Sequence, residues 1–129
     1  MTYHFSKIID LPFDAAVSAT IAALKHHGFG VLTQIDVKDT LKKKLGAEFR
    51  PYLILGACNP KLAYEALTLE DKIGTMLPCN VVIQQREGGR IEISAVDPVA
   101  SMAAIENPKL GDVAGKVREL LKQVVAEIA

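Results

Sequence analysis

The sequence predicts an α+β domain built on a single sheet of about five strands covered by helices. Apolar and polar residues alternate on both sides of Gly88-Gly89, which is typical of a hairpin, and a long apolar stripe near the C-terminus is typical of a core helix. No linker, repeat or low-complexity tract divides the 129 residues, so we expect one domain over residues 1–129.

The first half of the chain is predicted to alternate between strand and helix. Apolar residues recur at helical spacing after Pro12, a residue that favours a helix start, and Gly28 can end that helix. Leu41 and Leu45 lie four apart among lysines in a second, shorter helix that Gly46 ends. We therefore expect strands at 2–9 and 29–36 with helices between Pro12 and Gly28 and at 37–45.

An almost unbroken apolar run at 52–57 predicts the central strand of the sheet, either covered on both faces or crowded by a partner. Pro60 then begins a helix that extends through Leu67, and the charged residues after it predict a loop.

The hairpin comes next, with strands at 81–86 and 90–95 joined by a two-residue turn at Gly88-Gly89. Asp97-Pro98 closes its second strand, with Asp97 as a turn residue. The last helix follows Pro108, and its apolar stripe consists of Val113, Val117, Leu120, Leu121, Val124 and Ile128.

Charge argues against two classes of partner. The 15 basic and 15 acidic side chains cancel, so the chain lacks the positive charge typical of proteins that bind nucleic acid or an anionic membrane. A protein without net charge associates easily, which makes a homodimer a reasonable expectation. Two cysteines and no apolar leader predict a cytoplasmic protein.

The residues whose side chains could react or bind a ligand are concentrated in two short segments, each with a Cys-Asn beside a proline. Cys58 ends a predicted strand just before a helix, where the helix dipole can stabilise a thiolate, while Cys79 begins a strand. If both strands belong to one sheet, the two turns can lie close together. We therefore place the candidate ligand-binding site at Cys58, Asn59, Pro60, Pro78, Cys79 and Asn80.

Three interpretations of the cysteines remain open. They can be small buried residues that fill tight turns. They can form a cysteine pair for thiol chemistry, with Cys58 the more reactive sulfur and Cys79 resolving it. They can also bind a soft metal ion such as copper(I), alone or as four thiolates across a dimer, although the chain has no zinc-finger spacing and we assign no metal site.

Simpler structural roles fit the neighbouring residues. Asparagine favours turns, so Asn59 and Asn80 are expected to shape the backbone, and the prolines to begin and stiffen segments. His26 and His27 lie in the last turn of a predicted helix, where capping is the expected role. No dinucleotide, Walker or nucleophile-elbow motif is present, so no cofactor and no reaction can be assigned.

The cysteine turns also carry a resemblance. Together with residues 28–33, residues 35–37, Ile73-Gly74 and residues 96–98, they resemble the bacterial and archaeal family called domain of unknown function 302. The resemblance implies a small α+β fold of TATA-box-binding-protein-like architecture and a homodimer. It implies no activity and no DNA binding, because function depends on sites rather than on fold.

The sequence therefore leaves two hypotheses about function. One is a ligand-binding or thiol-chemistry domain with its site at the Cys58 and Cys79 turns, taking a small molecule or a soft metal ion. The other is a homodimeric structural or interaction module without chemistry.

Overall fold

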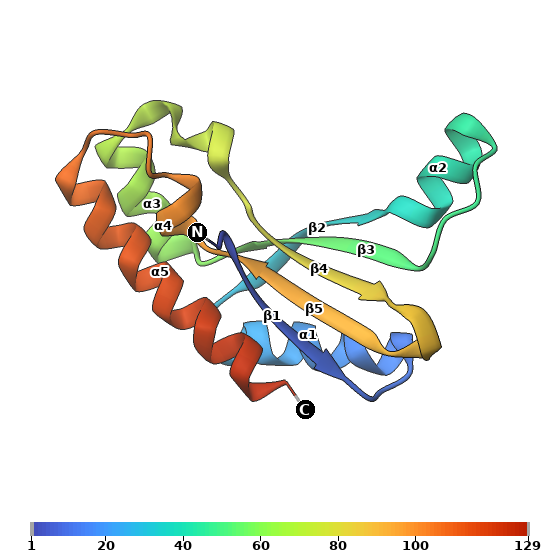
Figure 1. The fold of residues 1–129 in the computed structure, drawn as a ribbon. Coiled ribbons are helices and arrows are strands. Elements are labelled where there is room, and N and C mark those ends of the chain that lie inside the picture. The colour runs from blue at the N-terminus through green and yellow to red at the C-terminus, as the bar shows by residue number, and fades with distance from the viewer. Residues whose placement is uncertain (1, 129) are drawn as a thin grey trace.

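A computed structural model describes residues 2–128, which fold around one five-stranded antiparallel sheet (Figure 1). The strands lie in the order β1-β5-β4-β3-β2, and every neighbouring pair is antiparallel. The predicted α+β class with one sheet is confirmed. The strands are β1 (His4–Ile9), β2 (Gly30–Asp36), β3 (Tyr52–Cys58), β4 (Cys79–Gln85) and β5 (Ile91–Val96).

The β4–β5 hairpin supplies the centre of the core. Its alternating apolar residues are buried on one face, and Ile83 lies opposite Ile93 in the register. The predicted hairpin is confirmed, but the prediction of a two-residue turn is wrong. The connection is longer because it includes a 3-10 turn, η2 (Glu87–Gly89), and the Arg86 N–H donates to the Arg90 carbonyl at 2.7 Å.

Two helices pack on this buried face, α1 (Phe13–His26) and α5 (Pro108–Glu127). Asn107 caps α5 by accepting hydrogen bonds from two backbone N–H groups of its first turn. The predicted stripe on α5 is confirmed at its core positions, where Leu121 and Val124 are fully buried.

A second apolar cluster lies beyond the end of the sheet. It joins α3 (Pro60–Leu69), the 3-10 helix η1 (Asp71–Met76), the segment just after the short helix α4 (Pro98–Ser101) and the first turns of α5. Its buried members are Ala66, Ile73, Met102, Leu110, Val113 and Ala114.

Two expectations about this architecture are wrong, and Asp97 has a wider role than expected. The central strand is β4 rather than the 52–57 run, because β2 adds outside β3. The segment after α3 is helical where a loop was expected. Asp97 does more than turn the chain: it caps α4 through the Val99 N–H and accepts from Arg118 on α5 at 3.3 Å.

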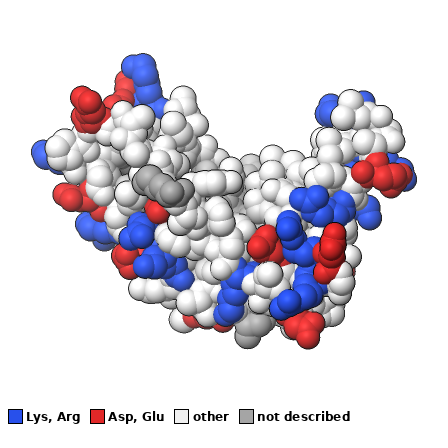
Figure 2. All heavy atoms as spheres, viewed as in Figure 1, with Lys and Arg blue, Asp and Glu red and all other residues white. Residues whose placement is uncertain are grey.

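The opposite face of the sheet is left largely uncovered, so the expectation of a sheet covered by helices holds for one face. Helix α2 (Val37–Leu45) joins β2 to β3 and projects from the far end of these strands, away from the other helices. A hollow lies between this projecting helix and the rest of the molecule, and few charged side chains line it (Figure 2). No helix within residues 2–128 is long and apolar enough to cross a membrane.

Removing a core side chain of α5 tests this packing. Leu121→Ala is expected to lower the free energy of unfolding by about 2 to 5 kcal/mol, because it leaves a cavity against the sheet. The matched control is Leu67→Ala on α3, where the side chain is 44% exposed and the loss should stay under about 1 kcal/mol. Urea titration measures both, and equal losses would contradict the assignment of the core.

Candidate functional site

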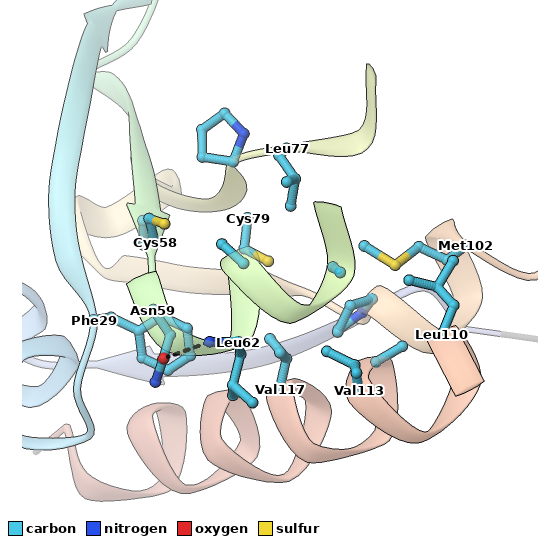
Figure 3. Close-up of a pocket in the computed structure, with 16 residues that line it drawn as sticks. Phe29, Cys58, Asn59, Leu62, Leu77, Cys79, Met102, Leu110, Val113 and Val117 are labelled. Atoms are coloured by element: carbon cyan, nitrogen blue, oxygen red, sulfur yellow. Dashed lines mark hydrogen bonds between the residues drawn. The ribbon is translucent and has the colours of Figure 1, made fainter. Parts of the chain in front are cut away.

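A small apolar cavity lies between the two cysteine turns (Figure 3). The end of β3, the start of α3, the segment before β4 and α5 form its walls. Its volume is about 30 Å³, room for little more than a water molecule or two, and its lining is almost wholly apolar. Besides the cysteines, the lining includes Phe29, Leu62, Leu77, Met102, Val113 and Val117.

The two cysteines contribute to the same cavity but do not form a pair. Both are free thiols, and Cys79 lies opposite Ala57 in the β3–β4 register rather than opposite Cys58. Side chains alternate along a strand, so Cys58 leaves β3 on the other side from Ala57. The predicted cysteine pair is therefore wrong, although the two turns are neighbours as expected.

Burial makes both thiols poor nucleophiles. It raises the pKa of Cys58, and it raises the pKa of Cys79 to about 11, with a smaller contribution from repulsion by the Cys58 thiolate. The expectation that the dipole of α3 lowers the pKa of Cys58 is wrong. Asn59, not Cys58, is the residue that caps the helix, with its Oδ1 accepting from the Leu62 N–H at 3.2 Å.

The remaining predicted site residues separate into two groups. Asn59 and Pro78 line the cavity, while Pro60 occupies the first turn of α3 as its sequence position predicted. Asn80 is exposed and lines a different hollow, on the uncovered face of the sheet. Ligand binding at these residues stays a prediction, and the structure divides them between two surfaces.

Gly56 is tightly packed against neighbouring side chains beside the cavity. A Cβ atom built on it would overlap Thr33 Oγ1 and lie 2.8 Å from Pro78 Cγ. The segment before β4 can therefore lie against β3 only because residue 56 lacks a side chain.

The uncovered face of the sheet carries a broader groove of about 340 Å³. At one end, Arg50 and Arg86 both donate to Gln84 Oε1, and the Gln84 amide donates to Glu92. At the other end, hydrogen bonds link His4, Ser6 and Ser94. The sequence analysis missed this surface, although the polar residues that alternate with Val81, Ile83, Ile91 and Ile93 could have indicated it.

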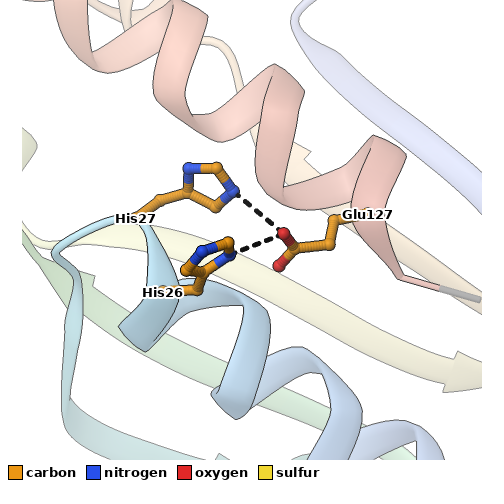
Figure 4. Close-up of side chains that lie close together, drawn as sticks. All are labelled: His26, His27 and Glu127. Atoms are coloured by element: carbon orange, nitrogen blue, oxygen red, sulfur yellow. Dashed lines mark hydrogen bonds and ion pairs between the residues drawn. The ribbon is translucent and has the colours of Figure 1, made fainter.

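A third cluster joins the C-terminal ends of α1 and α5 (Figure 4). His26 Nδ1 lies 2.6 Å and His27 Nε2 3.4 Å from Glu127 Oε1. The hydrogen bond from His26 lowers the pKa of the Glu127 carboxyl. His27 occupies the C-cap position of α1 through its backbone N–H, but both imidazoles face Glu127 instead of capping the helix as predicted. Glu127 is about a hundred positions away, and no sequence spacing indicated it.

Comparison with known proteins assigns the family. The family model described as "Domain of unknown function DUF302" matches residues 5–128. The chain belongs to the DUF302 family. A solved DUF302 structure, titled as an uncharacterized conserved protein from Bacillus stearothermophilus, is similar over 100% of both chains with 28% identity and a TM-score of 0.92. No curated protein matches this chain.

Thiol labelling tests the electrostatics of the cavity in this DUF302 protein. A raised pKa leaves less thiolate at any given pH, so native Cys58 should react with iodoacetamide more slowly at pH 8 than a free thiol, whose pKa is about 8.5. Cys79 should stay unlabelled until the protein unfolds. Peptide mass spectrometry over a pH series measures both rates, with labelling in urea as the control. Rapid native labelling of Cys58 with a midpoint below 8.5 would contradict this account.

The close approach at Gly56 gives a second test. Gly56→Ala should destabilise the protein by about 1 to 3 kcal/mol, because the added methyl group collides with Thr33 and Pro78. Gly30→Ala is the matched control, since Gly30 also lies in a strand and has no atom within 4 Å of an added Cβ. Thermal or urea unfolding compares the two, and equal effects would show that the contact is not restrictive.

Proposed function

We propose that this DUF302 protein works as a homodimeric interaction module whose two copies pair through α2. The observation that supports this is the exposure of the helix: none of its nine residues is buried. The side chain of Leu45 is 74% exposed, and Leu32 and Ile35 on the adjoining strand β2 are also exposed. Exposed apolar residues on neighbouring elements can mark a surface that a partner covers.

Local interactions hold α2 in its helical form. The Asp36 carboxylate accepts from the Asp39 N–H at 2.9 Å, Gly46 adopts the left-handed conformation that ends the helix, and Lys43 pairs with Asp39. A helix of nine residues is marginal in water without tertiary packing. A partner that covers the apolar side of α2 would supply the packing that such a short helix needs.

The groove on the uncovered sheet face is the surface that best receives this helix. It is concave, and Tyr52, Val82 and Val96 provide apolar surface within it. Glu92 is the carboxylate in its lining, but Arg50 and Arg86 lie at the same end, where both donate to Gln84. The fit of α2 to the groove therefore depends on apolar surface rather than on charge. Each copy offers one helix and one groove, so a reciprocal exchange uses both surfaces of both copies.

The cysteine cavity supports the first of the two predicted functions less well. Its volume of about 30 Å³ leaves little space for a ligand, and its thiols are held in the neutral form by burial. Thiol chemistry needs an accessible thiolate. The interaction module is therefore the function that the geometry favours.

Sedimentation velocity at micromolar concentration tests the dimer. We expect the unmodified protein to be a dimer and Leu45→Glu to weaken association by at least about tenfold, because the charge would be buried in the partner's groove. Tyr64→Glu is the control, since Tyr64 on α3 is also 74% exposed but lies outside both proposed surfaces. An unmodified protein that stays monomeric at every concentration would contradict the proposal.

A mixing experiment distinguishes helix exchange from other modes of association. Val82→Lys in the groove should also disrupt the dimer, but an equimolar mixture of Leu45→Glu and Val82→Lys proteins should dimerise. In the mixed dimer, the new glutamate faces the new lysine and the second helix meets an unmodified groove. If both variants are folded by circular dichroism and the mixture remains monomeric, the helix does not bind in the groove.

A further inference from the structure

The cluster at the ends of α1 and α5 offers three metal-ligating side chains that the interaction surfaces do not use. Donor atoms of His26, His27 and Glu127 all lie within 4.8 Å of one another. They come from the last residue of α1, the residue after it and the last residue of α5. The cluster is therefore anchored at two helix ends, and both helices pack on the same buried sheet face.

The buried imidazole nitrogen of His27 makes no well-formed hydrogen bond. Its side chain is only 16% exposed, and Nε2 makes no hydrogen bond to any group within residues 2–128 although Glu127 Oε1 is 3.4 Å away. A buried polar atom without a partner costs free energy, so such an atom calls for an explanation. A bound ion would satisfy it, because neutral imidazole coordinates metals through this nitrogen.

We infer that His26, His27 and Glu127 form a binding site for a divalent transition-metal ion of the zinc class. Two imidazole nitrogens and one carboxylate suit Zn²⁺, whereas Mg²⁺ and Ca²⁺ prefer oxygen ligands and copper(I) prefers sulfur. Three protein ligands leave the fourth position of a tetrahedral site for water.

The distances between donor atoms are compatible with this coordination. Tetrahedral zinc with bonds of about 2.0 to 2.1 Å holds its ligand atoms about 3.3 Å apart. His27 Nε2 and Glu127 Oε1 are already 3.4 Å apart. His26 Nδ1, now 2.6 Å from the same oxygen, must move away, and its side chain is 70% exposed and therefore free to rotate. Binding then replaces the hydrogen bond from His26 with a metal bridge between the two helix ends.

Isothermal titration of chelator-treated protein with Zn²⁺ tests the site. We expect one ion per chain at micromolar concentration, and at least about tenfold weaker binding for His27→Gln and for Glu127→Gln, since even the residues that merely support metal ligands contribute tenfold or more. The matched control is His4→Gln, which changes the remaining histidine, on β1, and should leave zinc affinity unchanged. Circular dichroism and urea titration establish that each variant is folded.

Two further measurements use the unmodified protein, so their outcome does not depend on how the variants fold. Zn²⁺ should shift the imidazole NMR signals of His26 and His27 but not those of His4. Bound Co²⁺ should show ligand-field absorption without a thiolate-to-cobalt charge-transfer band, which distinguishes this site from the cysteines. Absence of micromolar zinc binding would overturn the inference. Binding that persists in Glu127→Gln, or that is lost in Cys58→Ser while the histidine variants retain it, would overturn it as well.

Discussion

One-sided burial of the β4–β5 hairpin is the constraint on which the rest of the structure depends. Ile83 and Ile93 face the core, and α1 and α5 cover that face alone. The side chains that alternate with them face outward, so Gln84, Glu92 and Ser94 remain on the other face. A register slip of one residue would exchange the two faces. The polar groove and the apolar core are therefore two consequences of one pattern.

Local sequence patterns, over a few residues, made much of the fold predictable. Gly46 and the four-residue spacing of Leu41 and Leu45 predicted α2 with its observed bounds, because capping and periodicity are local. The order of the strands was not predictable in this way. Whether β2 pairs outside β3 depends on long-range packing, so an apolar run at 52–57 was mistaken for the centre of the sheet.

The candidate sites show the same division between local and long-range information. Pro60 predicted a helix start, and the structure has one. The reactivity assigned to Cys58 depended on the environment of its sulfur, which burial by distant elements determines. His26 and His27 were visible as a pair, but their carboxylate partner Glu127 comes from the other end of the chain. A site assembled from residues far apart in the sequence cannot be inferred from spacing along the sequence.

The irregularity in β2 has a consequence for how copies of this protein can assemble. The register against β3 shifts between Val31 and Thr33, so Leu32 is an extra residue on the edge strand. Such a bulge interrupts the regular row of backbone donors and acceptors that another strand would need. Without net charge to keep copies apart, a straight edge here would invite strand-by-strand growth into fibres. The bulge at Leu32 thus disfavours pairing of this edge with a strand of another copy.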